Sequence, residues 1–316
     1  MSLAPIVIAD SITRVGPEAT GAVVVNASHG GVYAAYLAAK LHAAAVIFND
    51  AGIGRDRAGI GGLDYLQELG IATAAVGHET ARIGDGADMM ATGVITHANS
   101  LARSLGVSTG QSCHDAATRL QQARPSAKPA PEALEAVFLL EIEPPQVWAL
   151  DSASLVLPEH KDAIVITGSH GGLLGGKPET ALKYDVRGAL YNDAGIGKDS
   201  AGTSRLPALD ARGIAAATVS AASARIGDAR STYEDGIISR VNRRAATLGL
   251  GEGISAREFV DRLRRAPKSI SASSTVLIMS PRTSRLDRRP LPSFARPCAG
   301  RGWWRSGGWC SGSASG

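Results

Sequence analysis

The sequence predicts an α/β protein made of two tandem-duplicated doubly wound units, each with a mainly parallel sheet, the two being related by a pseudo-twofold axis. One observation is that short apolar runs alternate with helical patterns. The other is an internal repeat, because the polar motifs of the first half return in the second at offsets of 141 and 143 residues. The motif Asn-Asp-Ala-Gly-Ile-Gly at 49–54 returns unchanged at 192–197. A duplicated chain commonly packs its copies in the manner of a symmetric dimer.

This repeat divides the chain into four segments. We expect a first α/β repeat over 1–126, a Pro-rich linker over 127–145, a second α/β repeat over 146–267 and a basic tail over 268–316. Within the linker, the pattern of the stretch around 132–142 indicates a short helix.

Individual elements follow from the apolar pattern. Four runs without alternation indicate strands buried on both faces of a sheet in the first repeat: 5–9, 22–25, 44–48 and 71–76. Helical spacing predicts helices at 34–41, at 60–69 with Gly70 as its end, and over a longer stretch near 87–105. The second repeat has strand patterns at 164–167, 189–191 and 214–219. Its segment after Gly172 contains Gly175, Gly176 and Pro178, so the helix expected there should be broken or shortened.

Composition excludes several classes of protein. With 316 residues, 44% hydrophobic and 20% charged, the chain has the profile of a globular protein with a sizeable core. No segment holds the roughly 18 consecutive apolar residues of a membrane-spanning helix, and no basic stretch precedes an apolar one at the N-terminus, so we expect a cytoplasmic protein without a membrane partner. Cys113 is the one cysteine before residue 268, which excludes a disulfide framework.

The net charge of +4 originates in the tail. Residues 268–316 hold eight basic side chains and one acid, a balance of +7, so residues 1–267 carry −3. The Ser, Gly, Pro and Trp content of the tail indicates a flexible or non-native terminus, such as an out-of-frame reading, rather than a segment that binds single-stranded nucleic acid. We therefore expect no nucleic-acid partner.

The repeated polar motifs each follow an apolar run. Because ligands of open α/β sheets bind beyond the carboxyl ends of the strands, these motifs predict a site at one edge of each sheet. We expect His29 and His170 to move a proton, with Asp50 and Asp193 orienting them, acting as bases or holding a divalent metal. Other residues are expected to bind a small-molecule anion, a carboxylate or phosphate. These are Ser28, Gly30, Gly31, Asn49 and Arg82 in the first repeat, and Ser169, Gly171, Gly172, Asn192 and Arg225 in the second.

Structural roles compete with these hypotheses. The double glycine of the first motif also fits a tight turn with Ser28 as the helix cap. Asp56 fits the cap of the helix that follows it. Arg82 equally fits an internal ion pair with Asp85 or Asp50 that braces two loops.

The two copies differ at positions that bear on chemistry. His78 and Glu79 face Ala221 and Ala222, so they favour the first half if one half alone is active. A metal cluster of His29, His78 and acids lacks the ligand spacing of recognisable zinc sites.

The run of a buried strand into Ser28-His29-Gly30 resembles the histidine end of the caspase-like cysteine peptidases. That resemblance implies a nucleophilic cysteine after the next strand, where this chain has Asn49-Asp50. Cys113 lies far along the chain, so we infer no peptidase activity.

Taken together, the motifs predict an enzyme that acts on a small anionic metabolite by hydrolysis or a related acid–base step at the strand ends of each repeat. One alternative is a non-catalytic protein that binds a nucleotide or metabolite at the same edge. A third interpretation is that the motifs hold the duplicated fold together. A homo-oligomer is compatible with the duplication.

Overall fold

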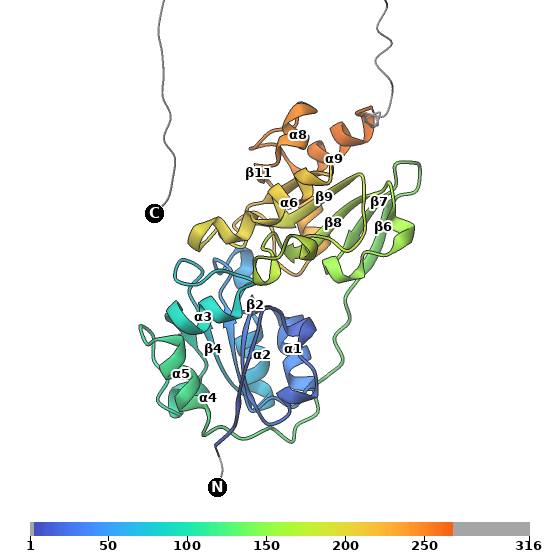
Figure 1. The fold of residues 1–316 in the computed structure, drawn as a ribbon. Coiled ribbons are helices and arrows are strands. Elements are labelled where there is room, and N and C mark those ends of the chain that lie inside the picture. Colours follow the sequence, from blue (N-terminus) through green and yellow to red (C-terminus); the bar gives the residue numbers. More distant parts are fainter. Residues whose placement is uncertain (1–2, 268–316) are drawn as a thin grey trace, which may run out of the picture. The chain divides into compact units, whose positions relative to one another are not determined.

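Two β-sheets organise the chain, one in each half of the sequence (Figure 1). The computed structural model describes residues 3–267, and the expectations for the basic tail lie outside the described residues. Both sheets belong to one unit that ends at Pro267. The predicted α/β class with two mainly parallel sheets is confirmed.

The first sheet has five strands, and their order follows the chain order without reversal. They are β1 (Ile6–Ala9), β2 (Val23–His29), β3 (Ala45–Asn49), β4 (Ala72–Val76) and β5 (Ile95–Ala98). The first four are parallel, and β5 runs antiparallel to β4. Strands β3 and β4 are buried along their whole length because helices cover both faces of the sheet, which explains their unbroken apolar sequence.

Helices α1 (Val32–Lys40) and α2 (Gly62–Leu69) pack on one face of this sheet, and α3 (Gly86–Thr92), α4 (Ser100–Ser104) and α5 (Cys113–Leu120) contribute to the core on the other. Gly70 ends α2 in the left-handed conformation, as the sequence predicts. The single long helix predicted near 87–105 is wrong. Gly93 ends α3, Ile95–Ala98 form the edge strand β5, and the Asn99 side chain caps α4. Pairing with β4 outweighs the helical spacing of this segment.

The second sheet has six strands in the order β11-β10-β9-β8-β7-β6. They are β6 (Val137–Glu141), β7 (Val147–Leu150), β8 (Ile164–His170), β9 (Gly188–Asn192), β10 (Ala215–Val219) and β11 (Ile238–Val241). Helices α6 (Arg205–Ala211), α7 (Ala229–Glu234), α8 (Arg243–Thr247) and α9 (Ala256–Arg265) accompany it.

Two expectations concern the second half. The helix indicated around 132–142 is wrong, because Val137–Glu141 pair antiparallel with β7 at the sheet edge. Val137 and Phe138 are residue types that favour strands, and β7 offers them an open edge. The interrupted helix after Gly172 is confirmed, since that segment forms only the short 3-10 turns Leu174–Gly176 and Pro178–Thr180.

The two halves meet through contacts that occur in reciprocal pairs. The Arg55 amide donates to the Ala221 carbonyl at 2.8 Å, and the equivalent Lys198 amide donates to the His78 carbonyl at 2.9 Å. A Cβ on Gly195 would lie 2.9 Å from the Cα of Gly52, its own counterpart in the repeat. Equivalent residues that contact each other, or each other's partners, are the signature of a twofold axis, so the halves pack as a pseudo-dimer.

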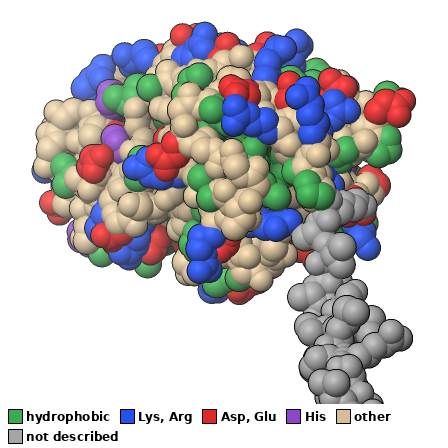
Figure 2. All heavy atoms as spheres, turned by 90° about the horizontal axis from the view of Figure 1, so that it is seen from above, with side chains coloured by type: hydrophobic (Ala, Val, Ile, Leu, Met, Phe, Trp, Pro, Cys, Tyr) green, Lys and Arg blue, Asp and Glu red, His purple; other side chains and the backbone are tan. Residues whose placement is uncertain are grey.

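The outer surface carries charges of both signs. Figure 2 shows Lys and Arg side chains interspersed with Asp and Glu over the visible face. Within residues 3–267, every helix is too short or too polar to span a bilayer.

Candidate functional site

Serine side chains join the ends of neighbouring strands. Ser28, at the end of β2, accepts a hydrogen bond from the Ile12 amide at 3.2 Å. Ser169, at the end of β8, accepts one from the Ala153 amide at 2.9 Å. These bonds fix the loops after β1 and β7 against the next strand, so the strand-end motifs converge. Gly31 rather than Ser28 occupies the N-cap of α1.

The asparagines of the second motif brace loops. Asn49 accepts from the Ala51 amide at 2.9 Å and donates to the Ala81 carbonyl at 3.2 Å. Asn192 makes the same pair of bonds in the second half. Both side chains are fully buried, and they hold the Ala-Arg-Ile-Gly-Asp loop of their own half against the sheet.

Asp50 and Asp193 face the contact between the halves rather than the strand-end histidines. Asp50 lies 2.8 Å from Nδ1 of His78 and accepts from Thr96 Oγ1 at 3.0 Å. The hydrogen bond to Asp50 raises the pKa of His78. Burial alone would raise the pKa of Asp50, but the contacts with His78 outweigh it and lower that pKa. Asp193 accepts from the backbone amides of Gly195 and Ala221. Neither aspartate lines the cavity described below.

Arg82 and Arg225 form internal ion pairs. Arg82 pairs with Asp85 of its own loop at 3.1 Å and with Asp199 of the other half at 3.0 Å. Arg225 reciprocates with Asp228 at 2.9 Å and with Asp56 at 3.2 Å. Asp56 therefore binds an arginine across the halves and does not cap α2, which begins after Gly61.

The glycine amides expected to bind an anion already have acceptors. The Gly30 and Gly171 amides donate to the carbonyls of the two buried asparagines. The Gly31 amide donates to His29 Nδ1 and the Gly172 amide to His170 Nδ1, both at 3.1 Å. Glycine is still required at position 171, because a Cβ there would clash with the Gly202 carbonyl oxygen.

These amide contacts determine the state of the two histidines. Nδ1 must be unprotonated to accept the amide hydrogen, so the neutral ring carries its proton on Nε2. Burial lowers the pKa of His29 to about 4, and burial followed by the charge of Arg205 lowers the pKa of His170 well below 6.5. Within residues 3–267, neither Nε2 has a protein partner and neither is sealed inside the packing. Each ring therefore presents an N–H donor to open space.

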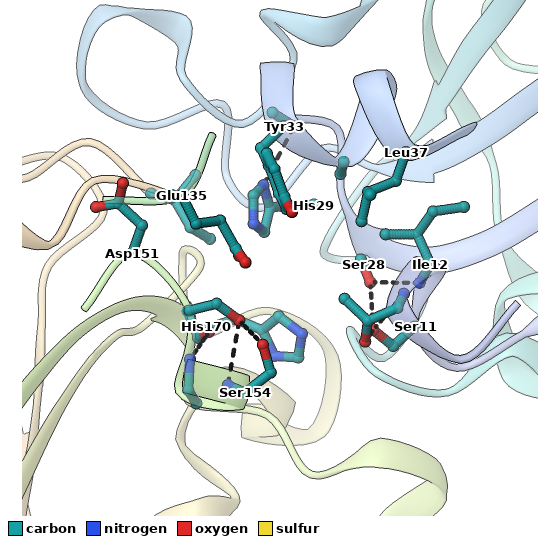
Figure 3. Close-up of a pocket in the computed structure, with 18 of the residues that line it drawn as sticks. Ser11, Ile12, Ser28, His29, Tyr33, Leu37, Glu135, Asp151, Ser154 and His170 are labelled. Atoms are coloured by element: carbon teal, nitrogen blue, oxygen red, sulfur yellow. Dashed lines mark hydrogen bonds between the residues drawn. The ribbon is translucent and has the colours of Figure 1, made fainter. Parts of the chain in front are cut away.

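That space is a cavity of about 710 Å³ to which both halves contribute (Figure 3). Of the predicted residues, those in its wall are Ser28, His29, Gly31, Ser169, His170 and Arg225. Each histidine packs against a glycine of the opposite half. A Cβ on Gly227 of the second half would lie 3.4 Å from Cε1 of His29, and a Cβ on Gly84 of the first half would lie 3.6 Å from Cε1 of His170. The two Ser-His-Gly motifs thus line one shared cavity.

Arg205 is the main cavity residue that sequence reasoning missed. Its side chain is 5% exposed, and it donates to the carbonyls of Gly172 at 3.0 Å and Ala181 at 2.6 Å. The Arg205 guanidinium lies over the Tyr191 ring, 5.0 Å from its centroid, and among the described residues no carboxylate lies within 4.0 Å of it. The only sequence signal is a difference between the copies, since Gly62 occupies this position in the first half. There Gly62 packs against Ala35 of helix α1, a helix that the second half lacks.

Further wall residues come from the linker and from the loops after β1 and β7. They are Arg14, Glu135, Asp151 and Ser152. Glu135 lies in the segment that we expected to act only as a connection, and its sequence context carries no signal for a site.

Within residues 3–267, no three His, Cys, Asp or Glu side chains are grouped so as to hold a metal ion. Cys113 is buried in the first core, and burial raises the pKa of its thiol to about 12. Comparison of the chain with family models, curated proteins and solved structures gives no match.

Proposed function

We propose that this chain binds a small anionic metabolite, a carboxylate or phosphate, in the cavity between its two halves. The observation that carries the proposal is Arg205, a buried cation in the cavity wall without a carboxylate partner among the described residues. A buried charge is costly unless an opposite charge compensates it. A ligand anion would supply that compensation, and the N–H groups of His29 and His170 would donate hydrogen bonds to its oxygens.

Binding is tested by thermal unfolding with inorganic phosphate and with a series of short carboxylates. A ligand at about one hundred times its dissociation constant adds about 2.7 kcal/mol to the free energy of unfolding. We expect at least one of these anions to raise the melting temperature of the wild type and to have no effect on Arg205→Met.

Arg187→Met is the matched control. Arg187 is part-buried, and like Arg205 it donates to main-chain carbonyls, those of Leu263 and Ala266, but it does not line the cavity. Its loss should leave the anion effect intact. An equal response in both variants, or no response of the wild type to any anion, would exclude Arg205 as the anion site.

Acid–base chemistry on the bound anion is the second candidate function. It is favoured by the paired histidines, because neutral imidazole N–H donors stabilise negative charge that develops on a carbonyl or phosphoryl oxygen. Hydrolysis of p-nitrophenyl esters and p-nitrophenyl phosphate provides the assay. The double variant His29→Asn/His170→Asn should lose any activity found while its melting temperature stays within a few degrees. A variant that retains full hydrolysis would rule out these two residues.

A further inference from the structure

Charge is distributed unevenly around the cavity. In Figure 3, Glu135 and Asp151 lie on one side of the two histidines, and Ser11, Ile12 and Leu37 lie on the opposite side. Ile12 begins the 3-10 turn Ile12–Arg14, which brings Arg14 to that second side.

The second side also includes the segment from Leu174 to Lys183, because a Cβ on Gly175 would lie 2.8 Å from the Asp10 carboxylate. This segment carries the exposed Glu179, and its Ala181 carbonyl accepts a hydrogen bond from Arg205. Arg14 and Arg205 come from different halves and both line the cavity, and the charge of Arg14 acts on the Arg205 guanidinium. Lys183 lines the same cavity. Arg14 is exposed and Arg205 is buried, so this end offers a fixed cation at its base and a second one toward solvent.

Acids gather at the first side. Glu135 interacts with Tyr33 of α1 and with Ser152 of the loop after β7, so both halves hold its side chain in place. Asp151 lies close enough for its charge to act on Glu135. Among the described residues, no Lys, Arg or His nitrogen lies within 4.0 Å of the Glu135 carboxylate, and Arg225 of the cavity wall is paired with Asp228 and Asp56. Burial raises the pKa of Glu135, and the charge of Asp151 acts in the same direction.

From this arrangement we propose that the ligand is a zwitterion, an aliphatic amino-carboxylate whose anionic group lies at Arg205 and Arg14 and whose ammonium group lies at Glu135. This inference rests on the proposed function, because it assigns the anion end to the same arginine. Apolar side chains of the cavity wall, Ile12, Leu37 and Leu174 among them, would contact the methylene chain of such a ligand.

Isothermal titration with matched probes tests the proposal. The probes are the ω-amino acids from glycine to 6-aminohexanoate, each compared with the unsubstituted carboxylate and the alkylamine of the same chain length. At the chain length that spans the cavity, we expect the amino acid to bind at least about tenfold tighter than the carboxylate, which corresponds to about 1.4 kcal/mol. The alkylamine alone should bind weakly, because it offers no negative charge to the buried arginine.

Two carboxylate variants make the test specific. Glu135→Gln should reduce the preference for the amino acid to about threefold or less while the affinity for the unsubstituted carboxylate stays nearly unchanged. Glu179→Gln removes an exposed carboxylate from the same cavity wall, outside the Glu135–Asp151 pair, and should keep the preference. Retention of the preference in Glu135→Gln would overturn the assignment of Glu135.

The remaining outcomes distinguish a failure of the zwitterion proposal from a failure of the proposed anion binding. If carboxylates bind in an Arg205-dependent way but no amino acid binds more tightly, the zwitterion is refuted and the anion site stands. If neither carboxylates nor amino acids bind, the proposed function fails and this inference fails with it.

Discussion

The cavity histidines should make the fold sensitive to mild acid. Burial lowers the pKa of His29 to about 4 from the ordinary 6.5. The unfolded chain therefore takes up a proton near pH 6.5 that the folded chain takes up only near pH 4. The stabilisation is fully present above pH 6.5 and is lost as the pH falls through that window. For this one histidine, linkage gives a loss of about 2 kcal/mol in the free energy of unfolding between about pH 6.5 and pH 4.5.

His29→Asn isolates this contribution. The Asn side chain keeps an acceptor where Nδ1 of His29 receives the Gly31 amide, but it has no group that titrates in this range. Urea unfolding followed by circular dichroism at several pH values measures the difference in free energy between wild type and variant. That difference should change by about 2 kcal/mol in favour of the variant as the pH falls from about 6.5 to about 4.5. A constant difference would show that His29 protonates as freely in the folded chain as in the unfolded one, and the assignment of a neutral donor would be refuted.

Two further predictions concern the contact between the halves. Gly195→Ala places a Cβ 2.9 Å from the Gly52 Cα at a φ of +76°, so it should lower the free energy of unfolding by about 3 kcal/mol. The control Gly213→Ala has a φ of +69° but no atom within 4 Å of the new Cβ, so it should lower that free energy by about 1 kcal/mol. Equal losses on urea unfolding would contradict the close approach of Gly195 and Gly52. A double-mutant cycle of Arg82→Met and Asp199→Asn should give a coupling of about 0.5 kcal/mol, because both side chains are solvent-accessible. Salt at about 1 M should remove most of it, and a coupling insensitive to salt would argue against a surface ion pair.

Much of the fold follows from local sequence. The apolar runs that become β1 to β4 and β8 to β10 are short, rich in Ala, Val and Ile, and followed by turn residues, so their strand character is encoded locally. The repeat itself favours the pseudo-dimer, because the twofold arrangement is the commonest way in which identical units pack. The edge strands β5 and β6 could not be predicted this way. Each pairs antiparallel with a neighbour within a segment whose wider pattern indicated a helix, so the open edge of the sheet decides their conformation.

The candidate site shows the same division. From the repeat and the strand ends, the sequence by itself determined that the Ser-His-Gly motifs of both halves would be held at the strand termini, where His29 and His170 lie. The tertiary structure decided which way the neighbouring polar side chains face. The aspartates and arginines of the other motifs lie at the contact between the halves, where the arginines pair with carboxylates of the opposite half. Arg205 takes the position at which Gly62 packs against helix α1 in the first half. The physical reason is that hydrogen bonds and ion pairs join side chains more than one hundred residues apart in the chain, which no local pattern of residue types can specify.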